Sequence, residues 1–142
     1  MYKRAIFHKD DKQISSWYDE IQFQGLMNSQ SNYYIVENND KEAIFDKDGK
    51  QVTDWFDWIE SKGLVEGQSP YYIVRDDGFY WINKLGSTRV LGPFKEIVDY
   101  GFIVDPSKSI IEVETPENRT TKIIKEELES FFEEENKDEQ TR

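Results

Sequence analysis

The 142-residue sequence contains no cysteine, one histidine and four prolines. Without cysteine the chain has no disulfide framework and no thiolate zinc site, and its single histidine, His8, cannot build a metal site alone. We interpret His8 as a surface residue. No run approaches the roughly 18 apolar residues of a membrane-spanning helix, and the N-terminal residues lack a signal-peptide pattern. We therefore expect a cytoplasmic protein with no membrane contact.

Motifs for nucleophilic catalysis and for cofactor binding are also absent. The chain has no Gly-x-Ser-x-Gly elbow, no phosphate-binding glycine loop and no dinucleotide fingerprint. Asp46-Lys47-Asp48-Gly49 resembles the start of a calcium loop, but its glycine comes fourth rather than sixth. We interpret this stretch as a hairpin turn. The sequence thus predicts a protein that is not an enzyme and holds no metal or cofactor.

The charge of the chain is strongly acidic and unevenly spread. Eighteen lysines and arginines against 29 aspartates and glutamates give a net charge of −11. Residues 126–142 contain eight acidic and two basic side chains, or −6, which leaves −5 for the first 125 residues. Binding to nucleic-acid phosphates needs clustered lysine and arginine, so we expect no direct nucleic-acid contact. An acidic surface instead favours a protein partner with a basic surface.

The main feature that is present is a pattern that recurs every 38 residues. Tyr33-Tyr34-Ile35-Val36 returns as Tyr71-Tyr72-Ile73-Val74, and residues 5–36 match residues 43–74 without a gap. A third copy is more divergent: residues 81–86 align with residues 44–49 at a spacing of 37. A fixed period of this size is typical of repeat architectures. We define unit one as residues 3–40, unit two as 41–78 and unit three as 79–113.

Turn residues predict how the units are connected. Asp76-Asp77-Gly78 lies between two aromatic and β-branched runs, which is a strong hairpin signal, and Asn38-Asn39-Asp40 has the same place in unit one. Within the units, Asp11, Gly49 and Gly86 occupy one turn position, and these residue types tolerate positive φ. We predict a mainly β domain over residues 1–120, in which three tandem hairpin repeats form one continuous antiparallel sheet. A small β-trefoil is the alternative.

The periodicity changes near residue 120. Four apolar side chains are spaced as on one face of a helix: Ile124, Leu128, Phe131 and Phe132. This spacing predicts a C-terminal helix over residues 121–135 whose apolar face docks on the sheet. Residues 136–142 are polar, and we expect a disordered acidic tail there.

Two kinds of tryptophan are distinguished by the period. Trp17 and Trp55 recur at the 38-residue spacing, so we expect both to be buried. Trp58 has glutamates as its counterparts, Glu20 and Glu96, and is therefore either a local core residue or an exposed contact residue. Tryptophan is enriched among interface hot spots. The candidate partner-binding residues are Trp58 and the carboxylates around it, Asp54, Asp57 and Glu60.

The unit resembles that of the WG-repeat family. The matching residues in unit two are Phe45-Asp46, Gly49, Val52, Phe56-Asp57 and Gly63-Leu64. The Trp-Gly pair that names the family is absent, and Glu42-Ala43 stands in its place. The resemblance covers about residues 3–113 and implies a β-rich repeat that often serves as an interaction module, with no shared catalytic residues.

These observations predict a non-catalytic, acidic protein-binding module. One class that fits is an inhibitor of a basic or nucleic-acid-binding partner, such as an immunity protein for a toxin or a phage or plasmid product. A structural or assembly subunit of a larger complex is the alternative. An unrecognised hydrolase is the third and least supported.

Overall fold

The strands form three antiparallel sheets. The computed structural model describes residues 3–7, 10–22, 31–65, 69–99 and 111–140. The first sheet contains β1 (Glu20–Gln22), β2 (Tyr33–Asn38) and β3 (Lys41–Asp46). The second contains β4 (Trp58–Glu60), β5 (Tyr71–Asp76), β6 (Phe79–Lys84) and β7 (Val90–Phe94). The third contains β8 (Glu96–Asp99), β9 (Ile111–Glu114) and β10 (Thr120–Ile123).

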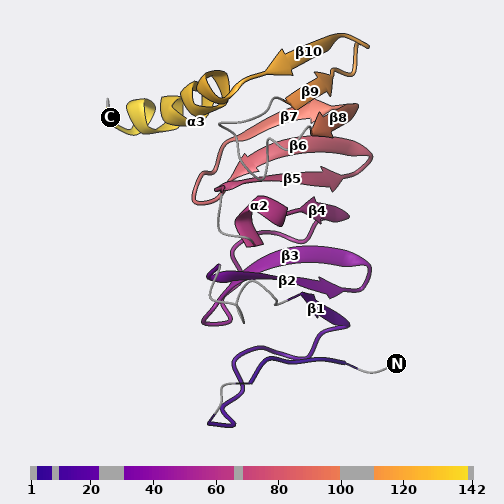
Figure 1. Cartoon of the computed structure of the whole chain (residues 1–142), viewed down its shortest axis with the longest axis vertical. Helices are drawn as coiled ribbons and strands as arrows, with labels where there is room; N and C mark the ends of the chain where they lie inside the picture. The colour runs from indigo at the N-terminus through magenta and orange to yellow at the C-terminus, as the bar shows by residue number, and fades with distance from the viewer. Residues whose placement is uncertain (1–2, 8–9, 23–30, 66–68, 100–110, 141–142) are drawn as a thin grey trace.

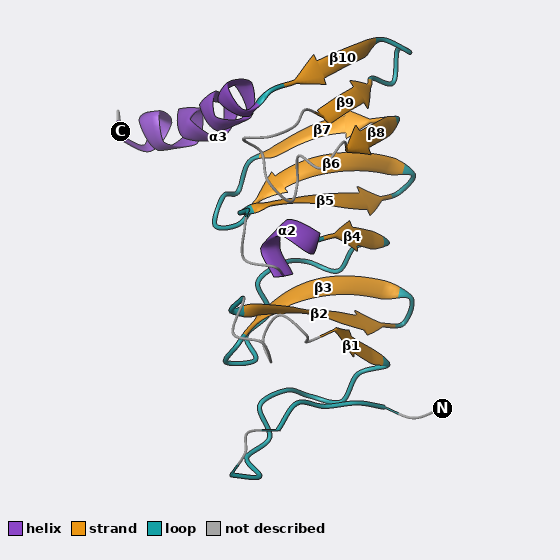
Figure 2. Cartoon of the chain, in the orientation of Figure 1, coloured by secondary structure: helices purple, strands orange, loops and turns teal. Residues whose placement is uncertain are grey.

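The sheets follow one another along the long axis of the molecule (Figure 1). The N-terminal segment lies at one end of the stack, and helix α3 (Lys125–Gln140) lies at the other. Figure 2 shows that strands make up most of the stack, with the short helix α2 (Lys62–Val65) between β4 and β5. The predicted mainly β fold with a C-terminal helix is confirmed. The single continuous sheet is replaced by three sheets, and the stack is open rather than closed into a trefoil.

Hairpins join the units as predicted. The two central residues of the β2–β3 turn, Asn39 and Asp40, have φ values of 54° and 62°, and Asp77 and Gly78 of the β5–β6 turn have 53° and 84°. Two successive positive φ values define the type I′ turn, whose twist matches that of the flanking strands. Each hairpin therefore pairs the last strand of one unit with the first strand of the next, and the sheets cross the unit boundaries.

Strand pairing in the first two sheets has the same register at a spacing of 38 residues. Ile35 pairs with Ile44 across β2 and β3, and Ile73 pairs with Ile82 across β5 and β6. The alignment of residues 81–86 at a spacing of 37 is therefore wrong by one residue within β6. Asn83 corresponds to Phe45 rather than to Asp46. The correction matters because a one-residue slip moves every side chain to the opposite face of a strand.

The core is arranged in layers on both faces of these sheets. The first core layer contains Ile21, Tyr34, Val36, Ala43 and Phe45. The second, between the first and second sheets, contains Ile35, Ile44, Ile59, Leu64, Tyr72 and Val74. Because neighbouring side chains of a strand point to opposite faces, β2 and β5 each supply two layers. For this reason the four-residue runs Tyr33–Val36 and Tyr71–Val74 contain no charged residue.

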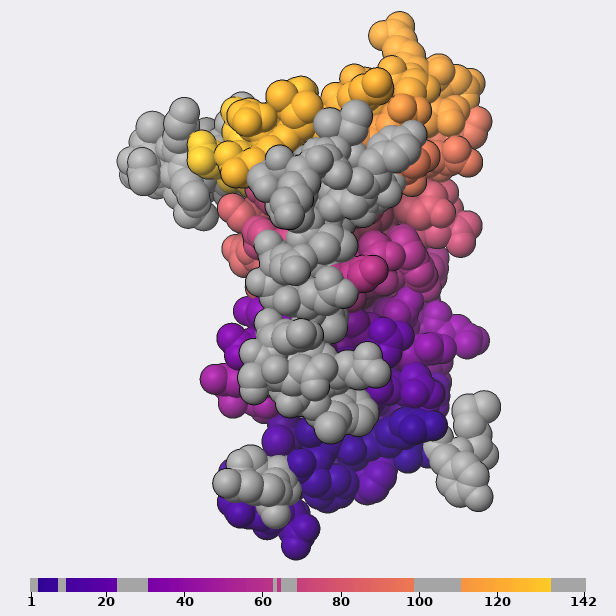
Figure 3. Space-filling model, viewed as in Figure 1, coloured from indigo at the N-terminus to yellow at the C-terminus, as the bar shows by residue number. Residues whose placement is uncertain are grey.

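The third core layer lies between the second and third sheets and ends against α3. Its members include Ile73 and Ile82 from the second sheet, Ile111 and Val113 from β9, and Leu128 and Phe132 from the helix. Figure 3 shows the same order on the surface, with colours passing from indigo at one end of the stack to yellow at the other. No helix in the described part of the chain has the length and apolar character needed to span a bilayer.

The outer face of the third sheet ends the stack. Ile35–Ile44 in the first sheet and Ile73–Ile82 in the second are equivalent cross-strand pairs. In the third sheet Glu112–Lys122, at the middle of β9 and β10, occupies the equivalent place. Ile111 and Val113 point into the third layer, so Glu112 points away from it. A charged pair replaces two isoleucines, which is how a terminal repeat keeps its outer face polar.

The C-terminal region differs from its prediction at both ends. Residues 120–123 form β10, the partner of β9, so residues 121–123 are in a strand rather than in the first turn of the predicted helix. Helix α3 therefore starts at Lys125 and runs to Gln140, into the stretch expected to be disordered. Leu128 is fully buried and Phe131 partly buried, but Ile124 is 42% exposed because it precedes the helix. Its predicted place on the buried face is wrong.

The predicted burial of both repeating tryptophans is wrong for Trp17. Trp17 is 55% exposed, and its ring lies 5.8 Å from that of Phe7 between centroids. Trp55 is half-buried, because its ring lies against Phe45 at 6.0 Å and against Tyr18 of the preceding unit at 6.1 Å. The described residues contain no unit before unit one, so nothing equivalent to Tyr18 covers Trp17.

Candidate functional site

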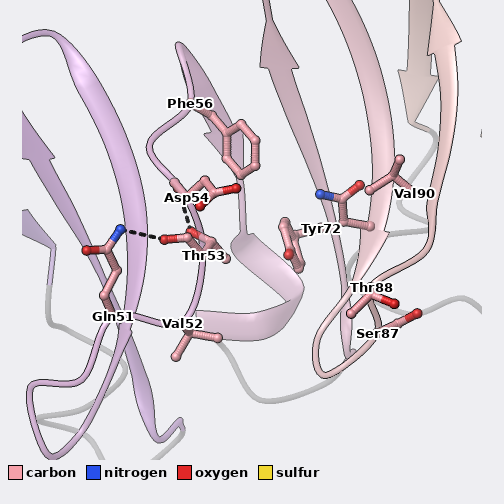
Figure 4. A pocket seen from close by; sticks show the side chains of 10 residues that line it. Gln51, Val52, Thr53, Asp54, Phe56, Tyr72, Ser87, Thr88 and Val90 are labelled. Carbon is pink, nitrogen blue, oxygen red and sulfur yellow. Dashed lines mark hydrogen bonds between the residues drawn. The ribbon is translucent and has the colours of Figure 1, made fainter.

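A pocket of about 590 Å³ opens between the hairpin turns of units two and three. This volume falls in the range of about 300–1,000 Å³ that is usual for ligand sites. In Figure 4, Gln51, Val52, Thr53 and Asp54 lie on one side and Ser87, Thr88 and Val90 on the other, with Tyr72 between them. Val52 and Val90 are 38% and 47% exposed, so both sides carry an exposed apolar residue.

Tyr72 and Asn83 are two buried residues of the pocket wall. They face each other across β5 and β6 and are 7% and 5% exposed. Burial raises the pKa of Tyr72, and a hydrogen bond from the side chain of Asn83 opposes that shift. The Oδ1 atom of Asn83 has no hydrogen-bond partner among the described residues. A buried acceptor without a partner is costly to the stability of the fold.

The pocket contains little that could perform acid–base chemistry. Of its ten lining residues only Asp54 and Tyr72 ionise, and the pKa of Tyr72 is raised further from neutrality. Within the described ranges, no three histidine, aspartate or glutamate side chains gather where a metal could bind. The Asp46 carboxylate accepts hydrogen bonds from the backbone N–H groups of Asp48 and Lys50, at 2.9 and 3.0 Å. This confirms the hairpin turn. His8 lies outside the described residues.

The structure separates the four predicted partner-binding residues. Asp54 is exposed and lines the pocket, whereas Trp58 and Glu60 lie on β4, the edge strand of the second sheet. Trp58 is 39% exposed. Its ring lies 6.3 Å from that of Tyr80, and the two are nearly perpendicular. Trp58 is therefore at the surface rather than in the core, and its role as a contact residue stays a prediction.

Asp57, the fourth predicted residue, makes contacts with two other segments of the chain. Its carboxylate forms an ion pair with Lys41 and accepts a hydrogen bond from the backbone N–H of Asp77 at 3.1 Å. The Lys41 hydrogen bond and the Asp77 N–H lower the pKa of Asp57. Thirty-eight residues earlier, Asp19 pairs with Lys3 at 2.8 Å and accepts from Asn39 N–H at 2.9 Å. Because the same two contacts recur at a spacing of 38 residues within this chain, we assign Asp19 and Asp57 a structural role.

A row of three glutamates crosses the first sheet, and we call it the acidic row. Glu20 pairs with Glu37, and Glu37 pairs with Glu42, so that the three side chains project from the same face of the sheet. Like charges in this arrangement destabilise a sheet. Among the ion pairs of the described residues, only Arg4 contacts the row, with its Nε 3.6 Å from Glu20.

Glu42 shows the electrostatic consequence of this crowding. Burial raises its pKa, and the charges of Glu37 and Glu60 raise it further, while a hydrogen bond from Ile59 N–H at 3.3 Å lowers it. Glu60, predicted as a partner-binding residue, is thus electrostatically coupled to the acidic row. The same row in the second sheet contains Trp58, Arg75 and Tyr80.

No family model, no curated protein and no solved structure matches the chain. The resemblance to the WG-repeat family therefore stays a prediction, and function has to be argued from the two sites described above.

Sequence reasoning reached Asp54 in the pocket but no residue of the acidic row, for specific reasons. The pocket depends on Asn83 taking the place of Phe45, and the 37-residue alignment hid that substitution. The acidic row joins residues that are 5 and 17 positions apart and meet only when β1, β2 and β3 pair. The sequence did contain one signal for the row. Glu20 occupies the repeat position that Trp58 occupies in unit two, and this difference indicates an exposed position at residue 20 as well as at residue 58.

Proposed function

We propose that this chain is a non-catalytic protein-binding module whose partner has a basic surface. The observation that carries the proposal is the acidic row, in which Glu20, Glu37 and Glu42 are neighbours across three strands and, within the described residues, Arg4 is the cation that forms an ion pair with them. Lysine or arginine side chains of a partner would relieve this repulsion. Complementary charges also speed association and suppress wrong pairings.

Trp58 precedes Ile59, whose backbone N–H donates a hydrogen bond to Glu42 of the acidic row. It lies on β4 with Glu60, whose charge acts on Glu42, and it is exposed. A partly exposed tryptophan beside charged residues is a common form of interface hot spot. Trp58→Ala should therefore weaken binding, whereas a chain ending at Asn136, which lacks part of the acidic tail, should bind like the wild type. The opposite result would show that the tail makes the contact.

A module of this kind suits an inhibitor. A partner that binds nucleic acid carries clustered lysine and arginine, and an acidic row can occupy that surface. The chain would then block nucleic-acid binding by competing for the same basic side chains. We expect the module to act in the cytoplasm, which cell fractionation would test.

A short peptide of lysine and arginine is a suitable probe for this proposal. We compare the variant Glu20→Gln, Glu37→Gln, Glu42→Gln with a control that loses three exposed carboxylates on α3: Glu126→Gln, Glu127→Gln, Glu133→Gln. Both variants change the net charge equally. The first should weaken peptide binding about tenfold, or about 1.4 kcal/mol over three ion pairs. Equal weakening in both variants would show a diffuse charge effect and contradict the proposal.

One observation favours a second function, that of an assembly subunit. Phe7 and Trp17 are 48% and 55% exposed at the N-terminal end of the stack, while Phe45 and Trp55 contact Tyr18 of the preceding unit. A partner that covers Phe7 and Trp17 would extend the stack. The mass of the purified protein in solution tests this function, because an assembly subunit is expected to exceed the mass of a monomer or small oligomer.

A further inference from the structure

Strand β10 has a free edge where the equivalent segments of the chain are paired. Residues 4–7 pair with residues 13–18, β3 pairs with residues 51–56, and β6 pairs with β7. We call residues 13–18, residues 51–56 and β7 the fourth segments of the repeat. β10 occupies the place of β3 and β6 in the third sheet, but within the described residues it pairs with β9 alone. Among these residues the third sheet therefore has no fourth segment.

The hydrogen-bonding groups on this edge follow from the first sheet. Glu42 of β3 donates its N–H to the carbonyl oxygen of Phe56 and accepts from the N–H of Phe56, each at 2.8 Å. The carbonyl oxygen of Ile44 also accepts from the fourth segment at 2.8 Å. In the pairing register Thr120 occupies the place of Glu42. Lys122 occupies that of Ile44. The N–H and C=O groups of both residues therefore point to the free edge, and those of the residues between them point to β9.

The edge of β10 is exposed and regular. Its first three residues, Thr120, Thr121 and Lys122, are exposed, and all four of its residues pair with β9 without a shift in register. The edge of β7 is different, because its register with β6 shifts and Pro93 has no N–H to donate. Bulges and prolines protect sheet edges from pairing with other chains. β10 has neither, so its edge is a template for strand addition.

The charges along this edge indicate what kind of segment it would bind. In a chain of net charge −11, residues 119–125 contain three cations and no carboxylate. Among the ion pairs of the described residues, none includes Arg119 or Lys122. A second copy of β10 would bring another Arg119 and Lys122 to the same edge. Aspartate or glutamate on an added strand would instead face these cations, which stabilises cross-strand pairs.

The fourth segments show what else such a segment would supply. The backbone N–H of Ile6 donates to Ser15 Oγ at 2.7 Å. Thirty-eight residues later, the N–H of Ile44 donates to Thr53 Oγ1 at 3.0 Å. Because Lys122 occupies the place of Ile44, its N–H would take the same acceptor. We therefore expect a serine or threonine opposite Lys122.

We propose that β10 binds an extended segment of a partner protein, which pairs antiparallel with it and completes the third sheet. The segment carries serine or threonine opposite Lys122 and acidic side chains next to it. Ile124 follows β10 and is 42% exposed, so it offers an apolar contact at the end of the strand. In this mode of recognition the backbone hydrogen bonds supply affinity, and the side chains of the segment supply specificity.

The inference goes beyond the proposed function because it concerns a different sheet and the opposite charge. The acidic row crosses the first sheet, and β10 lies at the other end of the stack, beyond the second sheet (Figure 1). The row would bind cations, whereas the edge of β10 would bind a segment with carboxylates. Each can therefore fail its own test without the other.

The probe is a capped heptapeptide with the sequence of residues 51–57, in which Trp55→Thr and Phe56→Thr remove rings that pack on the core layers. Amide hydrogen exchange of the full chain, followed by NMR, is the measurement. At a peptide concentration about ten times its Kd, exchange at Thr120 and Lys122 should slow about tenfold. Thr121 should change little, because its N–H already faces β9. Slowing at neither Thr120 nor Lys122 would overturn the proposal. Protection there that rises with protein concentration without peptide would also overturn it, because a second copy would then occupy the edge.

Two modified peptides separate backbone pairing from charge. N-methylation at the residues equivalent to Val52 and Phe56 removes two backbone donors that face β3 in unit two. It should weaken binding at least about tenfold. Replacing both aspartates by lysine should also weaken binding about tenfold. Equal binding of the N-methylated peptide would contradict strand addition, and equal binding of the lysine peptide would contradict an acidic partner.

Variants of the chain locate the site. Lys122→Gln should weaken binding about threefold. Lys47→Gln is the matched control, because it changes the net charge equally and lies exposed in the turn of unit two. Equal weakening in both variants would show a diffuse charge effect and contradict the proposal. Thr120→Pro removes an N–H that points to the free edge and should weaken binding at least about tenfold. If Thr120→Pro does not fold, the N-methylated peptide still decides whether a strand is added.

Discussion

Glu112 and Lys122 face each other across β9 and β10 at the place where Ile73 and Ile82 pair across β5 and β6. The isoleucine pair is buried in the third core layer, whereas the charged pair lies on the outer face of the last sheet. The three sheets share one pairing pattern. Differences at single positions of the repeat determine which sheet ends the stack, where the pocket lies and where the acidic row lies.

The first prediction concerns this terminal pair. The double variant Glu112→Ile, Lys122→Ile restores isoleucines on the outer face and should make that face apolar. Large exposed apolar patches promote association. We expect a larger mass than that of the wild type in sedimentation or light scattering at equal concentration. An unchanged mass would mean that the charged pair does not limit stacking.

The second prediction compares two aromatic residues of the repeat. Phe45 is 3% exposed and contacts three rings, those of Tyr18, Tyr34 and Trp55. Phe45→Ala should lower the free energy of unfolding by about 3–5 kcal/mol. Trp17→Ala, at a residue that is 55% exposed, should cost less than about 1 kcal/mol. Urea unfolding measures both, and equal losses would contradict the layered core.

The third prediction concerns helix α3. Leu128 is fully buried in the third core layer, so Leu128→Ala should cost about 2–5 kcal/mol. Ile124 is the matched control because it is 42% exposed, and Ile124→Ala should cost less than about 1 kcal/mol. An unfolding midpoint that does not change for Leu128→Ala would show that the helix does not dock on the sheet.

The fourth prediction is that two carboxylates affect stability with opposite sign. The folded-state pKa of Asp57 is lowered by Lys41, so its ionised form stabilises the fold above the unfolded pKa of about 3.9 and this stability is lost as pH falls. Asp57→Asn should therefore destabilise at pH 7, and the difference from wild type should shrink in acid.

Glu42 should behave in the opposite way. Its folded-state pKa is raised by burial, so the stabilisation of its protonated form is present at low pH and is lost as pH rises through that pKa. Glu42→Gln should thus leave stability unchanged or increase it at pH 7. Urea unfolding of both variants from pH 7 to pH 4 measures the two trends. Destabilisation by Glu42→Gln at pH 7 would contradict the repulsion assigned to the acidic row.

Part of this architecture follows from local sequence signals. Asn39-Asp40 and Asp77-Gly78 predicted the hairpins, because few residues adopt two successive positive φ values. The turn residues Asp11, Gly49 and Gly86 were aligned correctly, and all three have positive φ. The face of Leu128 and Phe132 was predicted by helical spacing.

Other features depend on tertiary pairing and were missed. Residues 121–123 were predicted as part of the helix although Thr121 and Ile123 are β-branched, because the strand forms only when β9 is its partner. Trp17 has the same sequence context as Trp55, and only the presence of Tyr18 beside Trp55 distinguishes their burial. The acidic row likewise exists only through the register of three strands.

The most direct test of the proposed binding function is an NMR titration with the lysine and arginine peptide. We expect the amides of Glu20, Glu37 and Glu42 and the indole N–H of Trp58 to shift together and saturably. The shifts should weaken as salt rises from about 0.1 M to about 1 M, because the Debye length falls from about 10 Å to about 3 Å. Shifts confined to α3, or shifts that do not saturate, would contradict the account.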